Sequence, residues 1–250
     1  MRIDLNADVG EASTPDGKTA EIAVLSAVTS VNIACGAHAG DLDTMHELVT
    51  AAAAAGVAIG AHPGYADREG KGRREQKLSA SEIATLVREQ VNLLMSVARA
   101  HRVEVRHVKP HGALYNQAAV DASIADAIAE GVRQASPALR LVGLARSELI
   151  RAARSAGLTA AAEAFADRAY RRDGTLVPRS ESHAVLTDDA VVVAQALSIA
   201  VRRRVQLDDG HRLDVDADTI CVHGDTPGAA QLARRVRESL TDAGVELRSL

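Results

Sequence analysis

The fold is indicated first by residues 3–11, which run Ile3-Asp4-Leu5-Asn6-Ala7-Asp8-Val9-Gly10-Glu11. The first part, Ile3–Asp8, is short and strand-like, and the polar residues Asn6, Asp8 and Glu11 gather at its end. The same arrangement recurs along the chain: a short strand, then polar residues, then a helix. This repetition predicts a series of strand–helix units, the pattern of α/β proteins with a parallel sheet.

Seven such units are predicted. The later strands are expected at Val31–Cys35, Val57–Ala61, Val105–Val108, Leu139–Leu144, Thr159–Ala164 and Thr219–Val222. The helices are expected at Thr19–Thr29, Asp41–Ala55, Ser79–His101, Ala122–Ala135, Ser147–Ala156, Asp188–Arg203 and Pro227–Ala243. A hairpin joining Val205–Leu207 to Arg212–Val215 and a closing strand at Val245–Leu247 complete the pattern.

The closure of the sheet follows from two features. The strands are interpreted as apolar on both faces, as buried parallel strands are. No glycine-rich dinucleotide fingerprint follows the first strand, which disfavours an open doubly wound sheet. We therefore expect an α/β protein with a distorted (β/α) barrel of about seven strand–helix units, in a single domain over residues 1–250.

Composition excludes several classes of partner. The chain has 29 Lys and Arg against 33 Asp and Glu, a net charge of −4, so it carries no electrostatic footprint for nucleic acid or an anionic membrane. No apolar run approaches the ~20 residues of a membrane span. Its two cysteines, Cys35 and Cys221, lie too far apart in sequence to suggest a disulfide framework. We expect a cytoplasmic protein without nucleic-acid or membrane partners.

Polar residues also follow the other predicted strands. The segments concerned are Cys35–Asp41, His62–Arg68, Lys109–Asn116, Glu163–Tyr170 and Cys221–Asp225. Because the carboxyl ends of barrel strands form one rim, these segments should converge on a single mouth. Histidines 38, 62, 107, 111 and 223 lie at strand ends or within the strand that leads to them. Histidines with purely structural roles would be expected at scattered positions and not gathered at strand ends.

The residue types at this mouth suit two kinds of chemistry. The carboxylates Asp8, Glu11, Asp41 and Asp225 and the imidazoles His38, His62, His111 and His223 suit general acid–base catalysis of hydrolysis. One Asp and two His could instead hold a divalent metal with an open water position, and the set predicted for this is Asp8, His38 and His62. The spacing is not a compact metal motif, and Asp41 is equally well placed to cap a helix.

Cationic residues complete the candidate site. Lys109, at the end of an apolar strand, could stabilise developing negative charge or bind a carboxylate, the alternative being a snorkelling side chain. Arg168 and Arg179 lie in one polar stretch, and arginine binds carboxylate or phosphate well. The chain has neither a nucleophile elbow nor a Walker-type phosphate loop. If ATP is used, its site is of another kind.

Several ordered motifs together resemble the LamB/YcsF family. They are residues 4–11, Asn32–Gly36, His38–Asp41, Gly60–Pro63, Val108–Asn116, Phe165–Arg168, Leu176–Ser180 and Val222–Asp225. The resemblance implies a barrel related to polysaccharide deacetylases and some glycoside hydrolases. It also implies the role of the A subunit in ATP-dependent hydrolysis of 5-oxo-L-proline to L-glutamate, with the 5-oxoprolinase subunits B and C as partners and ATP as cosubstrate.

With this resemblance, residue roles can be assigned as hypotheses. The predicted catalytic residues are Asp8, Lys109, His111 and Asp225, and the predicted substrate-binding residues are Asn6, Glu11, Tyr115, Arg168 and Arg179. Two other interpretations stay open. The chain could be a metal-dependent carbohydrate deacetylase or other amidohydrolase, or it could bind 5-oxoproline without performing chemistry.

Overall fold

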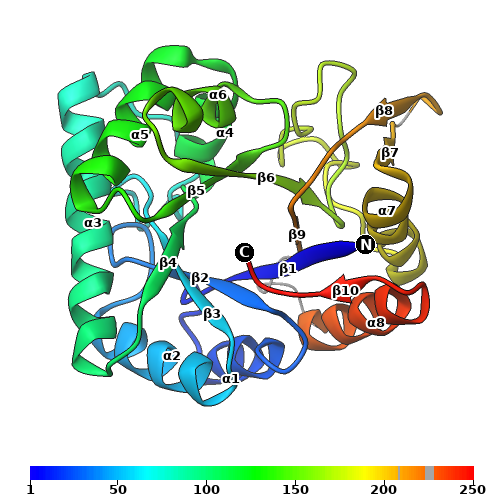
Figure 1. Cartoon of the computed structure of the whole chain (residues 1–250), viewed down its shortest axis with the longest axis horizontal. Helices are drawn as coiled ribbons and strands as arrows, with labels where there is room; N and C mark the ends of the chain where they lie inside the picture. Colours follow the sequence, from blue (N-terminus) through cyan, green and yellow to red (C-terminus); the bar gives the residue numbers. More distant parts are fainter. Residues whose placement is uncertain (208, 223–227) are drawn as a thin grey trace.

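Seven parallel strands close into a barrel in the computed structural model, which describes residues 1–207, 209–222 and 228–250 (Figure 1). In order around the barrel they are β1 (Arg2–Val9), β2 (Ser30–Ala34), β3 (Ala58–His62), β4 (Val105–Val108), β5 (Arg140–Leu144), β6 (Thr159–Phe165) and β9 (Thr219–Cys221). Strand β9 pairs with both β6 and β1, so the sheet has no open edge there. The predicted α/β barrel is confirmed.

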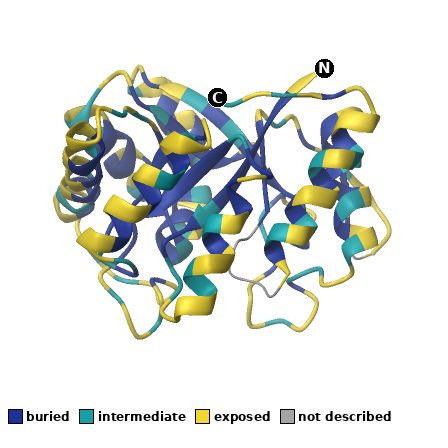
Figure 2. Cartoon of the chain, turned by 90° about the horizontal axis from the view of Figure 1, so that it is seen from below, coloured by how far each residue is buried: buried dark blue, intermediate teal, exposed yellow. Residues whose placement is uncertain are grey.

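Helices surround this barrel, and their exposed faces point outward (Figure 2). They are α1 (Pro15–Val24), α2 (Leu42–Ala54), α3 (Ala80–Ala100), α4 (Gly112–Val120), α5 (Ala122–Ala135), α6 (Glu148–Ser155), α7 (Asp189–Arg202) and α8 (Ala229–Asp242). The predicted hairpin is present as β7 (Arg204–Gln206) and β8 (Arg212–Asp214), and β10 (Glu246–Leu247) pairs with the start of β1. Within the described ranges, no helix is long and apolar enough to cross a membrane.

Two predicted helix starts are set by side-chain caps. Ser79 accepts a hydrogen bond from the backbone of Glu82, whose carboxylate accepts one from Ser79 in return, so α3 begins with a capping box. Asp41 accepts from the backbone N–H of Thr44 at 2.8 Å. The cap interpretation of Asp41 is therefore confirmed, and its carboxylate is bound to the start of α2.

Two helices differ from expectation. Helix α1 begins at Pro15 instead of Thr19, because Thr14 caps it and Pro15 occupies its first turn, and it ends at Val24 instead of Thr29. Helix α4 was not predicted, since residues 112–116 were interpreted as a polar loop. Its first turn has no side-chain cap, and its buried Ala113, Leu114 and Tyr115 pack inward from a segment that carries no start signal in sequence.

The interpretation of the strands as apolar on both faces was wrong for the inner face. Alternate residues of β1, namely Asp4, Asn6 and Asp8, carry polar side chains into hydrogen bonds with neighbouring strands. The Asp4 carboxylate accepts from Ser30, and the Asn6 amide donates to Glu163. A polar interior is tolerated because these groups are bonded to one another, so little unpaired polarity is buried.

Gly60 shows how this interior is accommodated. A Cβ added there would lie only 2.1 Å from Nε2 of His107 on the neighbouring strand β4. The His107 ring therefore occupies the space that a side chain on Gly60 would fill, and its Nε2 lies 2.8 Å from Oδ1 of Asn32. Glycine at this position lets a large polar ring enter the barrel.

Helix α5 offers a stability test, because it packs closely on α3 at Gly131. Helix propensity alone predicts that Gly131→Ala stabilises the fold by about 1 kcal/mol. However, the new Cβ would lie 2.5 Å from the Ala84 carbonyl oxygen of α3. We therefore expect a loss of about 1–3 kcal/mol in urea denaturation. A more stable variant would show that α3 and α5 can move apart enough to accommodate the new methyl group at little cost.

Candidate functional site

A cavity of about 610 Å³ lies at the carboxyl ends of the strands. One part of its wall carries Asp8, Glu11, His62, Lys109 and His111, which come from the ends of β1, β3 and β4. The structure thus brings together polar segments that are far apart in sequence, as expected for the rim of a barrel. Cavities of this size are typical of small-molecule sites.

Lys109 lies at the base of this wall and is only 2 % exposed. Its Nζ donates to Asp8 Oδ1 at 2.9 Å and to Cys221 Sγ at 3.2 Å, and it lies 2.9 Å from Glu163 Oε1. Although burial opposes its charge, Asp8 and Glu163 hold the pKa of Lys109 well above its usual range. The ammonium therefore anchors these side chains and has no further N–H for a ligand.

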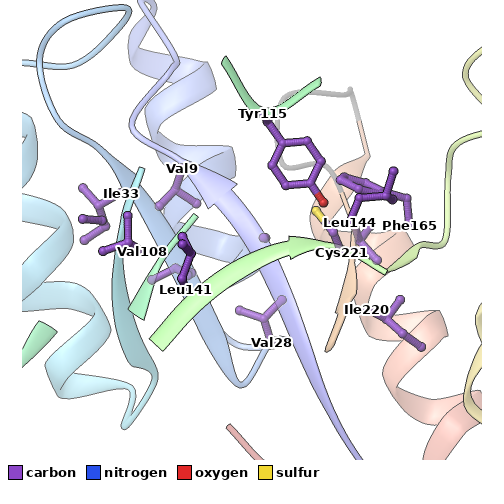
Figure 3. Close-up of a cluster of buried hydrophobic side chains, with 14 of the residues drawn as sticks. Val9, Val28, Ile33, Val108, Tyr115, Leu141, Leu144, Phe165, Ile220 and Cys221 are labelled. Carbon is purple, nitrogen blue, oxygen red and sulfur yellow. The ribbon is translucent and has the colours of Figure 1, made fainter. Parts of the chain in front are cut away.

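Glu163 connects Lys109 to the aromatic side of the cavity. Its Oε2 accepts from the Tyr115 hydroxyl at 2.8 Å, and burial raises the pKa of the Glu163 carboxyl. Tyr115 packs edge-on against Phe165, with ring centroids 5.8 Å apart. Figure 3 shows both rings near Leu144 and Cys221, at the ends of β5, β6 and β9. This apolar contact fixes the position of the Tyr115 ring at the cavity wall.

Three imidazoles lie together beside Asp8 and Glu11. His62 Nε2 is 2.9 Å from His111 Nδ1, and the two rings are nearly perpendicular, at 82°. Glu11 Oε1 lies 3.1 Å from His111 Nδ1, and Asp8 Oδ2 lies 3.5 Å from His62 Nε2. His38 stacks flat on His111, with centroids 3.9 Å apart. Glu11, His38 and His111 each offer a ligand atom within 4.8 Å of the others, so these residue types suit a divalent metal.

Burial sets the charge of these rings. It lowers the pKa of His62 to about 4 and that of His107, which also faces Lys109, to about 3. Burial and the neighbouring rings lower the pKa of His38 to about 2. These three imidazoles are therefore neutral near pH 7. Although burial opposes its ionisation, the His111 hydrogen bond holds the pKa of Glu11 well below its usual range.

Residues outside the cavity position the acidic groups. Asn32 Nδ2 donates to Asp8 Oδ1 at 2.8 Å and also to Asn6 Oδ1, so one amide holds both side chains. Glu21, on α1, accepts from the backbone N–H groups of Glu11 and Ala12 at 2.9 Å each. The loop after β1 is thereby held in place, and with it the Glu11 carboxylate.

Arginines occupy another part of the cavity wall, where Arg73, Arg168 and Arg179 lie. The Arg168 guanidinium donates to the carbonyl oxygens of Val177 and Ala184, and burial with the nearby Arg179 lowers the pKa of Arg168 to about 10. Arg168 thus both holds its loop together and contributes charge to the wall. Clustered guanidinium groups favour an anionic ligand.

The remaining predicted site residues are placed as follows. Tyr115 lines the cavity, whereas Asn6 is 2 % exposed and lies inside the barrel with its amide bonded to other side chains. His38 is buried and stacked on His111. Asp225, together with His223, lies outside the described residues.

No site role was predicted for Glu163, Glu21 or Asn32, although Glu163 begins one of the polar segments expected at the mouth. A signal for Glu163 was present, because it is the one charged residue in the run Thr159–Phe165. A carboxylate in a buried strand is rare unless it is paired. Glu21 and Asn32 carry no such signal, since a polar residue on a helix or in a strand that borders the interior is common.

Comparison with known proteins identifies the family. Residues 3–250 match the model of the LamB/YcsF family. The 5-oxoprolinase A subunit from Methylococcus capsulatus is 49% identical over 99% of this chain and 95% of its own length. The crystal structure of a lactam utilization protein from Thermus thermophilus superimposes with a TM-score of 0.92 at 42% identity, covering both chains fully.

A more distant likeness concerns the fold alone. The structure of T48 deacetylase has a TM-score of 0.50 at 15% identity and covers 98% of this chain and 86% of its own. The barrel is therefore shared with a deacetylase, as the resemblance implied. The match over nearly the whole sequence, supported by relatives of high identity, shows that this chain belongs to the LamB/YcsF family.

Proposed function

We propose that this chain opens the lactam ring of 5-oxo-L-proline, as the A subunit of an ATP-dependent 5-oxoprolinase of the cytoplasm that also contains subunits B and C. The observation that carries the proposal is the cavity of about 610 Å³, whose wall combines acid–base groups with Arg168 and Arg179. Those arginines suit two anionic groups, the carboxylate of the substrate and a phosphate on its lactam oxygen. The name of the Methylococcus capsulatus relative supports this activity.

The chemistry explains why ATP is needed. The lactam is an unstrained amide, and transfer of a phosphoryl group from ATP to its oxygen releases ADP and makes the ring carbon electrophilic. Addition of one water at that carbon and cleavage of the C–N bond, with a proton passing to nitrogen, gives an acyl phosphate. A second water releases phosphate and leaves L-glutamate.

In this proposal Asp8 assists the addition of water. Its carboxylate lines the cavity, is oriented by Asn32 and Lys109, and lies 3.5 Å from the neutral His62 ring. General acid–base assistance of this kind contributes ~10²–10⁴-fold to a rate. Lys109 holds Asp8 in place, and Glu11 and His111 lie beside it, 3.1 Å apart.

The test is glutamate release from 5-oxoproline, measured for this chain alone, with subunits B and C, and with both subunits but without ATP. We expect glutamate only in the complete mixture. Equal activity of the isolated chain without ATP would contradict the coupling. If a verified complex forms no glutamate, the proposed function is wrong. Other amides, such as acetylated sugars, would then be tested as substrates.

A further inference from the structure

Each of the two central histidines has one ring nitrogen held by a backbone carbonyl. His62 Nδ1 lies 2.7 Å from the Lys109 carbonyl oxygen, and His111 Nε2 lies 2.8 Å from the Lys71 carbonyl oxygen. A carbonyl oxygen only accepts, so each of these nitrogens carries a hydrogen. His62 Nε2 and His111 Nδ1 are therefore the nitrogens that can offer a lone pair to a ligand.

These two nitrogens face each other and the Glu11 carboxylate across short distances. His62 Nε2 and His111 Nδ1 are 2.9 Å apart, and Glu11 Oε1 lies 3.1 Å from the second and 3.7 Å from the first. Three atoms that can each act as a metal ligand therefore converge on one point, while the far nitrogen of each ring is already held by a backbone carbonyl. An ion bound there would replace any hydrogen that His111 Nδ1 shares with Glu11.

We propose that His62 Nε2, His111 Nδ1 and the Glu11 carboxylate bind one divalent transition-metal ion of the Zn²⁺ type. Two imidazole donors favour such an ion over Mg²⁺ or Ca²⁺, which prefer oxygen ligands. The backbone carbonyls that hold the far nitrogens act as the outer contacts that usually orient metal-binding histidines. All three residues line the cavity, so the open positions of the ion face it.

The ring planes exclude His38 from this ligand set. A nitrogen lone pair lies in the plane of its ring, so the ion must lie in the plane of His111. The His38 ring is parallel to that plane, at 0°, and is stacked with centroids 3.9 Å apart. The lone pairs of His38 therefore lie in a plane parallel to the one that contains the ion, and they do not point at it. The His62 ring, at 82° to His111, can direct its lone pair to the same point.

The test measures metal instead of turnover, so its outcome is independent of the proposed reaction. The chain is stripped with a chelator, and binding of Zn²⁺ and Co²⁺ is followed by titration calorimetry and by metal content after dialysis. One confounding site is visible on the surface, where His46 Nδ1 and His101 Nε2 lie 2.8 Å apart. All measurements therefore use the His46→Ala background.

We expect one equivalent of Zn²⁺ per chain, with visible absorption of the Co²⁺ form. Glu11→Gln and, separately, His62→Gln should weaken Zn²⁺ binding by at least about 100-fold, since even outer contacts contribute ~10–100-fold. His38→Asn should retain the ion. The proposal fails if the wild-type site in this background binds no ion, or if folded His38→Asn loses the ion as completely as Glu11→Gln does. In the first case the close contacts would be explained by an Nδ1–H of His111 that donates to Glu11.

Discussion

Replacing Lys109 with methionine should abolish ring opening and lower the free energy of unfolding by about 3–5 kcal/mol. The ammonium contacts Asp8 and Glu163 at 2.9 Å each and is almost fully buried. Methionine fills a similar volume but leaves both carboxylates without their cation. Urea denaturation measures the stability, and glutamate release by the assembled enzyme measures the activity.

A double variant separates the lost charge from the lost packing. Glu163→Gln removes one of the uncompensated carboxylates and can still accept from Tyr115. Added to Lys109→Met, it should recover about 0.5–3 kcal/mol of stability, the usual coupling between residues in contact. Activity should not return, because Asp8 still lacks its cation. The exposed Lys77→Met is the matched control and should change stability by less than about 0.5 kcal/mol.

Near-wild-type stability of Lys109→Met would contradict this account. It would mean that the carboxylates take up protons or water at little cost when the ammonium is absent. If stability falls but turnover persists, Lys109 holds the barrel together without contributing to the reaction. The two measurements together show whether the ion pair contributes to stability, to the reaction or to both.

The barrel was predictable because its signals are local and repeated. Short strands alternate with helices, and Ser79 and Asp41 mark helix starts by hydrogen bonds within one turn. Helix α4 could not be predicted in this way, since it starts at Gly112 without a side-chain cap and is stabilised by burial of Leu114 and Tyr115. The polar interior was also missed, because apolar outward-facing residues such as Leu5 and Ala7 dominate the strand pattern.

The location of the site was more predictable than its internal contacts. Parallel strands bring their carboxyl ends to one rim, which places Asp8, His62 and His111 near one another without any knowledge of side chains. Which atoms meet depends on ring orientation. The Lys109 carbonyl orients His62 and the Lys71 carbonyl orients His111, and these pairs are 47 and 40 residues apart in sequence. The pairing of Glu11 with His111 likewise depends on Glu21, which holds the loop after β1.

Asp8→Asn should lower glutamate formation by the assembled enzyme by about 10²–10⁴-fold, the contribution of general acid–base assistance. Asparagine keeps the shape of the side chain and can still accept from Asn32, while Glu163 still pairs with Lys109. The chain should therefore fold and assemble. Circular dichroism and co-purification with subunits B and C check this before kinetics are measured.

The same strand offers a matched control in Asp4, whose carboxylate lies at the other end of the barrel and accepts from Thr29, Ser30 and Thr219. Burial raises the pKa of Asp4, so the neutral Asp4→Asn should be tolerated and should leave turnover near the wild-type value. For Asp8→Asn, a fall in kcat with little change in KM would indicate an interaction made only in the transition state. A rise in KM with kcat unchanged would instead show that Asp8 only binds substrate, and the water would then have to be activated at the site formed by Glu11, His62 and His111.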